Sequence, residues 1–398
     1  MSAWNTARIS SFCSTGTGGT PSRANMQRYY DGGTIPWVKS GELRENVILG
    51  TAELVTDAAI RETNMKLVPS GALLLAMYGA TVGRLGILGI PATTNQAVCH
   101  IIPDPKAAEV PYLFHALSYQ VSNIVALGVG GAQPNISQGI IKDLELPLPP
   151  LPAQRRIAAI LDQAEALRTK RRAALGLLDG LAQAVFLEMF GDSKADGWPV
   201  ATVGDIADSA RGAIRTGPFG SQLLHSEFVD EGIAVLGIDN AVANEFRWGE
   251  RRFISEAKYR ELKRYTVHPG DVLITIMGTC GRCAVVPESI PTSINTKHLC
   301  CISLQREVCL PTFLQAYFLR HPTAQRYLRQ TAKGAVMDGL NMGIIKAMPI
   351  TLPPLPLQKA FAARIAAIEN LKTTHRASLT QLDALFASLQ HRAFRGEL

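Results

Sequence analysis

The sequence has few cysteines and no long uninterrupted apolar run. Its 398 residues include seven cysteines, an odd number with an adjacent pair at 300–301, which does not fit a disulfide framework. No basic-then-apolar signal is seen at the start, so we expect a reducing, cytoplasmic setting. The most membrane-like stretch, 71–90, is rich in glycine and interrupted by Arg84. This pattern favours buried strands and predicts no membrane contact.

Signatures of catalysis are also missing. The glycine-rich segments 16–19 and 128–131 lack both the phosphate-loop ending and the full dinucleotide fingerprint, so we interpret them as loops. The Pro-Pro pairs are flanked by leucines and do not form the Asn/Asp-Pro-Pro-aromatic signature of a methyltransferase. No carboxylate cluster suits a metal-dependent nuclease. We therefore expect a non-catalytic chain with no cofactor of its own.

One group of residues resembles a zinc site. Cys280 and Cys283 are followed by His298 and Cys300, and such ligands bind zinc when they converge. The aligned stretch of the first half, 81–85, has no cysteine, so the fold there does without a metal. We expect buried strand thiols and no metal.

The composition is that of a globular protein, with 47% hydrophobic and 18% charged residues. The length suits two domains. A net charge of +7 favours an anionic partner only slightly.

The most informative feature is an internal repeat. The heptapeptide at 148–154, Leu-Pro-Pro-Leu-Pro-Ala-Gln, recurs at 352–358 with six identical positions, at an offset of 204 residues. Other matches join Trp4 with Trp198, 71–75 and Gly79 with 270–274 and Gly278, Asn95 with Asn295, and 110–111 with 310–311. We infer two copies of one plan.

Each copy is predicted to be strand-rich first and helical last. Segments 71–78 and 270–277 are apolar runs typical of buried strands, and 111–122 and 311–328 have helical spacing broken only at His321-Pro322. The proline run is expected to be an extended strap into a long helix, 154–190 in the first copy. Apolar residues form a seam at Ile157, Leu161, Ala164, Leu167, Leu175, Leu178, Leu181 and Val185, and at Phe361, Ile365, Ile368, Leu371, Leu379, Leu382, Leu385 and Leu389.

The two seams have no partner unless they cover each other, which predicts an antiparallel pair. The expected fold class is mixed α+β: two repeated α/β domains, each followed by a long helix, with pseudo-two-fold symmetry. The boundaries are 1–147 and 196–351 for the domains, and 148–195 and 352–398 for the helical segments. Arg171 and His375 occupy equivalent seam positions, which we interpret as local exits to solvent.

Several short motifs occur in a specific order. In the first half they are 18–22 (GGTPS), 35–41 (IPWVKSG), 78–83 (YGATVG), 94–97 (TNQA) and 131–136 (GAQPNI). In the second half 216–221 (TGPFGS), Lys297 and Gly334 fit the same pattern. Together with the strap, they resemble the specificity subunit of a type I restriction-modification system over essentially the whole chain.

The resemblance implies a division of labour. Each domain would be a target-recognition domain that reads one half of a split, asymmetric site in double-stranded DNA. The helices would fix the gap between half-sites and dock two methyltransferase subunits, and motor-nuclease subunits would join them. S-adenosylmethionine, ATP and Mg²⁺ would belong to these partners. Similar modules on one face of B-DNA need a spacing of about 34–36 Å or a multiple of it, which a rigid helix pair could set.

Base reading requires basic and amide side chains near the grooves, and the candidates lie beside glycine- or proline-marked loops. They are Arg23, Lys39, Arg84, Gln133 and Asn135 in the first half, and Arg215, Ser221, Arg282, Lys297, His298 and Lys333 in the second. For any single one of them, a solvated charge or a loop-capping amide is the competing interpretation.

Two alternatives stay open. The chain could be a self-contained DNA methyltransferase or nuclease, which would need a cofactor loop. It could also be a coiled-coil scaffold that gathers protein partners without reading DNA.

Overall fold

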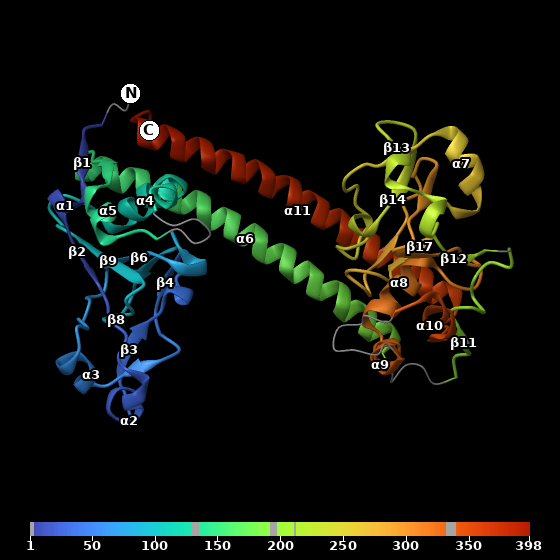
Figure 1. Cartoon of the computed structure of the whole chain (residues 1–398), viewed down its shortest axis with the longest axis horizontal. Helices are drawn as coiled ribbons and strands as arrows, with labels where there is room; N and C mark the ends of the chain where they lie inside the picture. The colour runs from blue at the N-terminus through green and yellow to red at the C-terminus, as the bar shows by residue number, and fades with distance from the viewer. Residues whose placement is uncertain (1–3, 129–134, 192–196, 211, 332–339) are drawn as a thin grey trace. The chain divides into compact units, whose positions relative to one another are not determined.

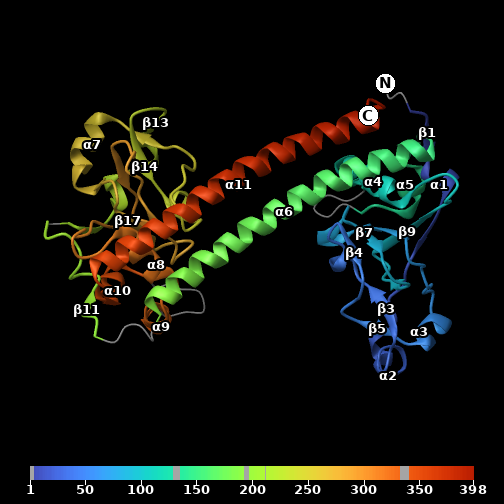
Figure 2. The same cartoon turned by 180° about the vertical axis from the view of Figure 1, so that it is seen from behind.

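The computed structural model describes residues 4–128, 135–191, 197–210, 212–331 and 340–398. It divides into two compact units (Figures 1 and 2). Unit 1 comprises Met1–Arg172 with Ala377–Leu398, and unit 2 comprises Ala173–Arg376. The two long helices, α6 (Leu151–Phe190) and α11 (Leu355–Arg395), each contribute one part to each unit.

Unit 1 contains a larger sheet, a smaller sheet and a separate pair formed by its first and last strands. Its strands are β1 (Thr6–Arg8), β2 (Cys13–Thr17), β3 (Ile35–Val38), β4 (Asn46–Ile48), β5 (Leu54–Val55), β6 (Leu73–Ala76), β7 (Leu85–Leu88), β8 (Thr93–Thr94), β9 (Val98–Pro103) and β10 (Glu145–Pro147). Its shorter helices are α1 (Ile9–Phe12), α2 (Met26–Tyr29), α3 (Asp57–Glu62), α4 (Val110–Ala126) and α5 (Gln138–Asp143). The larger sheet has the order β2-β9-β6-β7-β4 and the smaller one β5-β3-β8. Helices α4, α5 and α6 lie by the larger sheet, whereas α2 and α3 lie with the smaller one (Figure 1).

Unit 2 repeats this plan. Its strands are β11 (Val200–Thr202), β12 (Ile214–Thr216), β13 (Phe228–Val229), β14 (Ile233–Leu236), β15 (Phe253–Ile254), β16 (Thr266–Val267), β17 (Val272–Thr275), β18 (Cys283–Val285), β19 (Ser293–Asn295), β20 (Leu299–Ile302) and β21 (Pro349–Thr351). Its shorter helices are α7 (Glu256–Leu262), α8 (Pro311–Arg320), α9 (Pro322–Thr331) and α10 (Met342–Ala347). The sheet β12-β20-β17-β18 corresponds to the larger sheet of unit 1, and β13-β15-β14-β19-β16 contains the counterpart of the smaller one.

The predicted strands and helices are confirmed. β6 and β17 lie within the expected segments and are buried along their whole length, because both faces of each sheet are covered. The break between α8 and α9 falls at His321, where Pro322 cannot continue the helix. Helix α6 begins three residues before its predicted start and α11 begins at the equivalent residue, so the end of each proline run is helical and not extended as predicted. Pro152 and Pro356 thus lie in their first turns, where a missing N–H costs nothing.

Within each unit the long helices pair antiparallel, as predicted. In unit 1, Arg168 Nε lies 2.6 Å from Asp383 Oδ1. In unit 2, Lys372 Nζ lies 2.7 Å from Asp179 Oδ1. In the repeat, position 168 of α6 corresponds to 372 of α11, and position 179 of α6 corresponds to 383 of α11. The two ion pairs are therefore equivalent: each joins the same two repeat positions, one on each helix. The predicted mixed α+β class is confirmed.

The predicted seam is wrong at four leucines. Leu167, Leu181, Leu371 and Leu385 are each about half exposed, at 46%, 47%, 51% and 49%. Towards its end, α6 instead buries Ala182, Phe186 and Phe190, and the two phenylalanine rings pack against Phe361. The apolar stripe of a straight helix drifts away from a strict heptad pattern, so the buried positions change along the helix.

The membrane expectation needs one correction. Among the described residues, α6, and not segment 71–90, contains a stretch long and apolar enough to cross a membrane by length and composition alone. A single helix of this kind is weak evidence for a membrane span, and 17% of its apolar stretch is buried within the protein. Here Phe186 and Phe190 belong to the core of unit 2, and Asp179 is paired with Lys372.

The register of the repeat also differs from the sequence prediction. Strand pairing makes Thr296, not Asn295, the counterpart of Asn95, because the N–H groups of Asn95 and Thr296 donate to Val38 and Leu236 at the ends of β3 and β14. The N-caps of α4 and α8 are Glu109 and Leu310, so these two residues correspond. The sequence match of 110–111 with 310–311 is therefore shifted by one residue. Unequal loop lengths shift the offset along the chain.

Candidate nucleic-acid interface

Two equivalent loops follow the central strands. Loop 79–84 follows β6 and loop 278–282 follows β17. Each has two glycines with positive φ: Gly79 (80°) and Gly83 (83°), and Gly278 (69°) and Gly281 (78°). Only glycine adopts this region readily, so both loops require glycine at these places. The loops end alike, with the N–H of the strand residue donating to the arginine carbonyl at 2.9 Å in each (Ala76 to Arg84 and Thr275 to Arg282).

These loops expose the two predicted arginines. The side chains of Arg84 and Arg282 are exposed, immediately before β7 and β18. No hydrogen bond or ion pair joins either guanidinium to another residue in the part of the chain that the structure describes. Both cations are therefore available to an anionic partner at the same end of the sheet.

A second segment lies against each loop. The N–H of Met77 donates to Ala97 O at 2.8 Å, and the N–H of Ile276 donates to His298 O at 2.9 Å. This contact brings Lys297 and His298, both partly exposed, beside loop 278–282. Burial, followed by the nearby cations Lys297 and Arg252, lowers the pKa of His298 below its ordinary value, so its imidazole is neutral at neutral pH.

A third turn approaches this end through a glycine in each unit. A Cβ at Gly18 would lie 1.8 Å from Thr94 O, and one at Gly217 would lie 2.0 Å from Asn295 O. Glycine is thus required in the motifs 18–22 and 216–221, where backbone packs on backbone. The second turn leads to Ser221, which is exposed in a 3-10 helix (Gly220–Gln222).

In unit 1, Arg23 and Lys39 converge on one carboxylate. Lys39 Nζ lies 2.5 Å from Glu53 Oε1, and Arg23 pairs with the other oxygen of Glu53. The Arg23 guanidinium also stacks over the Tyr30 ring at 4.3 Å. The pKa of Glu53 is lowered, chiefly by the hydrogen bond from Lys39. The two predicted cations thus form one cluster with an acid that sequence reasoning missed.

Three further candidates are Asn135, Gln133 and Lys333. Asn135 is exposed, next to Ile136, whose N–H donates to Met77 O at 2.8 Å beside loop 79–84. Gln133 and Lys333 lie outside the described residues.

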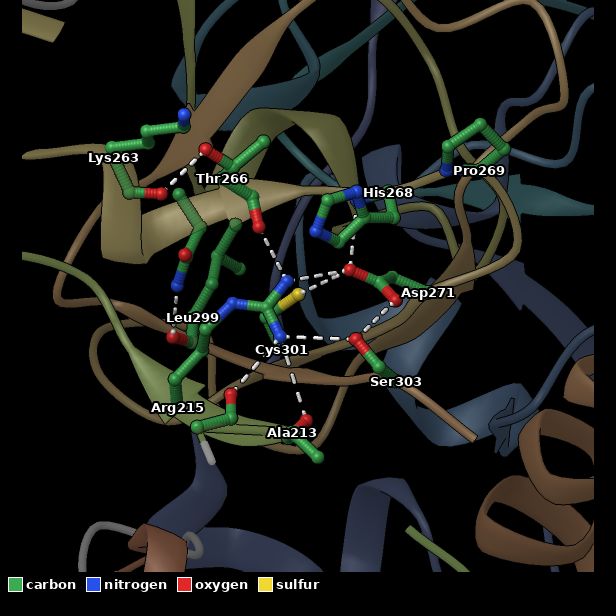
Figure 3. A network of polar contacts seen from close by, with 12 residues as sticks. Ala213, Arg215, Lys263, Thr266, His268, Pro269, Asp271, Leu299, Cys301 and Ser303 are labelled. Atoms are coloured by element: carbon green, nitrogen blue, oxygen red, sulfur yellow. Dashed lines mark hydrogen bonds and ion pairs between the residues drawn. The ribbon is translucent and has the colours of Figure 1, made fainter. Parts of the chain in front are cut away.

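Arg215 has a different position from the one expected. Its side chain is 10% exposed and forms an ion pair with Asp271, itself 3% exposed, at 2.7 Å. Its terminal nitrogens also donate to Thr266 O at 2.5 Å and Ser303 Oγ at 3.0 Å (Figure 3). Cys301 Sγ donates to Asp271 at 3.2 Å. Because its terminal N–H groups are bonded within the domain, Arg215 has a structural role there and does not extend from a loop that could read bases.

The same places in unit 1 hold different residues. Strand register makes Gly16, Ala72 and His100 the counterparts of Arg215, Asp271 and Cys301. A Cβ at Gly16 would lie 2.4 Å from His100 Nε2, so the His100 ring occupies the space beside that glycine. A buried ion pair in one unit is therefore replaced by a buried imidazole in the other.

Cys283 and Cys300 lie as strand thiols, as expected, whereas Cys280 lies partly exposed in the turn before β18. Cys283 and Cys300 are fully buried in β18 and β20. Burial raises the pKa of Cys300 to about 12 and that of Cys283 higher still. No group of three or more His, Cys, Asp or Glu residues gathers as a metal site within the described ranges.

Sequence reasoning also missed Arg252 and Asp239 in unit 2. Arg252 Nη2 lies 2.6 Å from Asp239 Oδ1 beside an open pocket that His298 also lines. No motif marks these residues, and only the strand register brings them to this end.

Comparison with known proteins finds matches along both halves of the chain. The family model described as type I restriction modification DNA specificity domain matches residues 1–175 and again 196–383. The EcoBI specificity subunit of Escherichia coli is 26% identical over 77% of this chain and 70% of its own length. The MjaVIII specificity subunit of Methanocaldococcus jannaschii is 21% identical over 99% and 93%. The solved S subunit of a type I restriction-modification system from M. genitalium superimposes with a TM-score of 0.60 at 16% identity, covering 99% of this chain and 96% of its own.

Proposed function

Because the chain belongs to the type I restriction-modification DNA specificity domain family, twice matched along its length, we propose that it is the sequence-reading subunit of such a system. Each unit reads one half of a split, asymmetric site in double-stranded DNA. The chain itself is non-catalytic, and it acts with its partners in the cytoplasm.

One observation carries the proposal: the same glycine-shaped loop exposes an arginine, Arg84 or Arg282, at the same end of each unit. The other candidate side chains differ between units, with Arg23 and Lys39 in one and Lys297, His298 and Ser221 in the other. Equivalent loops suit equivalent docking on the phosphate backbone, whereas different side chains suit different bases. An asymmetric bipartite target follows.

The long helices support two further parts of the proposal. Leu167 and Leu385 are exposed on unit 1, and the equivalent Leu371 and Leu181 are exposed on unit 2. Apolar side chains in equivalent places on both units suit two copies of one partner, which we propose to be methyltransferase subunits. The paired helices would set the gap between the half-sites.

The remaining partners follow from the family. Motor-nuclease subunits would join the complex for cleavage, and S-adenosylmethionine, ATP and Mg²⁺ would be bound by the partner subunits. The net charge of +7 suits a DNA-binding subunit.

The test is co-expression with the neighbouring methyltransferase, followed by single-molecule sequencing of the modified DNA. We expect methylation at one interrupted, asymmetric motif that depends on this chain. A motif that persists when the chain is omitted would refute the proposal, and methyl transfer by the purified chain alone would favour the enzyme alternative. A complex that assembles but protects no specific duplex would favour the scaffold.

A further inference from the structure

One position, beside β3 in unit 1 and beside β14 in unit 2, carries opposite charge in the two units. The N–H of Trp37 donates to Glu53 O at 3.1 Å, and the N–H of Val235 donates to Arg252 O at 2.8 Å. The following strands, β5 and β15, pair antiparallel with β3 and β14 in matching register. Glu53 and Arg252 are therefore equivalent in backbone position.

The Arg252 guanidinium is oriented but not enclosed. Its Nη2 group pairs with Asp239 Oδ1 at 2.6 Å, and its side chain remains 36% exposed. A Cβ at Gly237 would lie 2.6 Å from Arg252 Nη2 and 2.7 Å from Asp239 Oδ1. Glycine at 237 thus leaves room for this ion pair to lie close over the backbone.

Arg252 lies at the reading end of unit 2. It lines an open pocket of about 470 Å³ together with Ile238, Asp239 and His298. Ile238 Cδ1 lies 3.0 Å from the Cβ position of Gly278, so the pocket adjoins loop 278–282, which exposes Arg282. Arg252 thus sits among the residues already proposed to face DNA.

The geometry favours one base. A guanidinium has five donors in a planar fork, and a carboxylate that takes one of them fixes the plane of the rest. Within the described residues, Asp239 is the acceptor that contacts the Arg252 side chain. A fixed fork with free terminal donors matches the O6 and N7 acceptors of guanine in the major groove.

We propose that Arg252, positioned by Asp239, reads a guanine in the half-site of unit 2. This inference rests on the proposed function. Unit 1 differs at the equivalent position, where Glu53 gathers Lys39 and Arg23 instead. This charge reversal gives the two units different base preferences on the same backbone.

The experiment uses the full chain in complex with its methyltransferase partner and reads the methylated motif by single-molecule sequencing. The variants are Arg252→Gln, Arg252→Lys and Asp239→Asn. The matched control is Arg306→Gln, which removes a half-exposed arginine whose guanidinium contacts Pro269, before β17 and thus at the opposite end of that strand. Thermal melting verifies that each variant is folded.

We expect both Arg252 variants to lose preference for one guanine in one half-site by about 5- to 150-fold. Lysine keeps the charge but not the fork, so Arg252→Lys separates base reading from simple attraction. We expect Asp239→Asn to weaken the preference for the same guanine and Arg306→Gln to leave the methylated motif unchanged. If Arg252→Gln does not fold, the motifs of Arg252→Lys and Asp239→Asn test the inference in its place.

An unchanged motif in folded Arg252→Lys would overturn the inference. Changes in both half-sites, or a uniform loss of methylation at every sequence, would also overturn it. If the wild-type complex shows no split motif, the proposed function fails and this inference falls with it. If the wild-type motif is present and the variants keep it, only the inference fails.

Discussion

At the residue scale, the glutamine that ends the repeated proline motif has a structural role. Its side chain forms three hydrogen bonds, which we call the clamp. Gln154 Nε2 donates to Ala107 O at 2.9 Å and to Pro149 O at 2.8 Å, and its Oε1 accepts from the Glu109 N–H at 2.9 Å. Gln358 makes the equivalent three bonds in unit 2, and both side chains are fully buried. The motif thus fastens the start of each long helix to the loop before α4 or α8.

Replacing either glutamine by leucine should destabilise its unit. Gln154→Leu or Gln358→Leu leaves two carbonyls and one N–H without their partner, at a cost of about 1–3 kcal/mol for each group that stays buried. Urea unfolding of each variant measures the loss. Gln183→Leu, on an exposed face of α6, is the control and should be close to neutral. Equal stability of all three variants would contradict the clamp.

The Arg215–Asp271 pair gives a second prediction. Arg215→Met leaves Asp271 as a buried charge without its partner and should cost about 3–5 kcal/mol, whereas Arg215→Met with Asp271→Leu should recover much of that loss. Chemical unfolding compares the two. The double variant should also keep both half-sites of the methylation motif, because the pair lies within the domain. Loss of one specific base in that variant would return Arg215 to the reading residues.

At the scale of elements, the sequence predicted what depends on local pattern. The buried strands 71–78 and 270–277, the break at His321 and the antiparallel helices follow from apolar spacing and prolines. The Arg168–Asp383 and Lys372–Asp179 ion pairs were not predicted, although the repeat aligns their positions.

The candidate site was predictable only in part. Arg84 and Arg282 follow glycines whose positive φ exposes them, and a glycine-marked loop signals this in sequence. Arg215 fits the same signal, yet its partner Asp271 is 56 residues away and becomes a neighbour only through pairing of β12, β20 and β17. Long-range register, which decides which charges are neutralised, is not contained in local motifs.

The long helices give a prediction at this scale. Two helical connections join the units, so an insertion in α6 alone would make them unequal in length. Inserting four residues after Arg172 and four after Arg376 lengthens both by about 6 Å and keeps each unit intact. We expect the gap between the half-sites to change while both half-site sequences remain, as read from the methylated motif. The same insertion in α6 alone should lower the melting temperature. Changed half-sites with an unchanged gap would contradict the role of the helices as a spacer.

At the scale of the whole molecule, one chain contains two units built on a single plan, which we propose to be two readers. Each unit has its own sheets, core clusters and exposed loops. The polar residues proposed to read bases belong to one unit or the other. Independent reading of two half-sites follows from this separation.

Exchange of one reader tests that claim most directly. Residues 1–147 are replaced by the corresponding domain of a relative with a known, different half-site, and the methylated motif of the reconstituted complex is sequenced. We expect one half-site to take the relative's sequence while the other half-site and the gap stay as in the wild type. A change in both half-sites, or in neither, would contradict it.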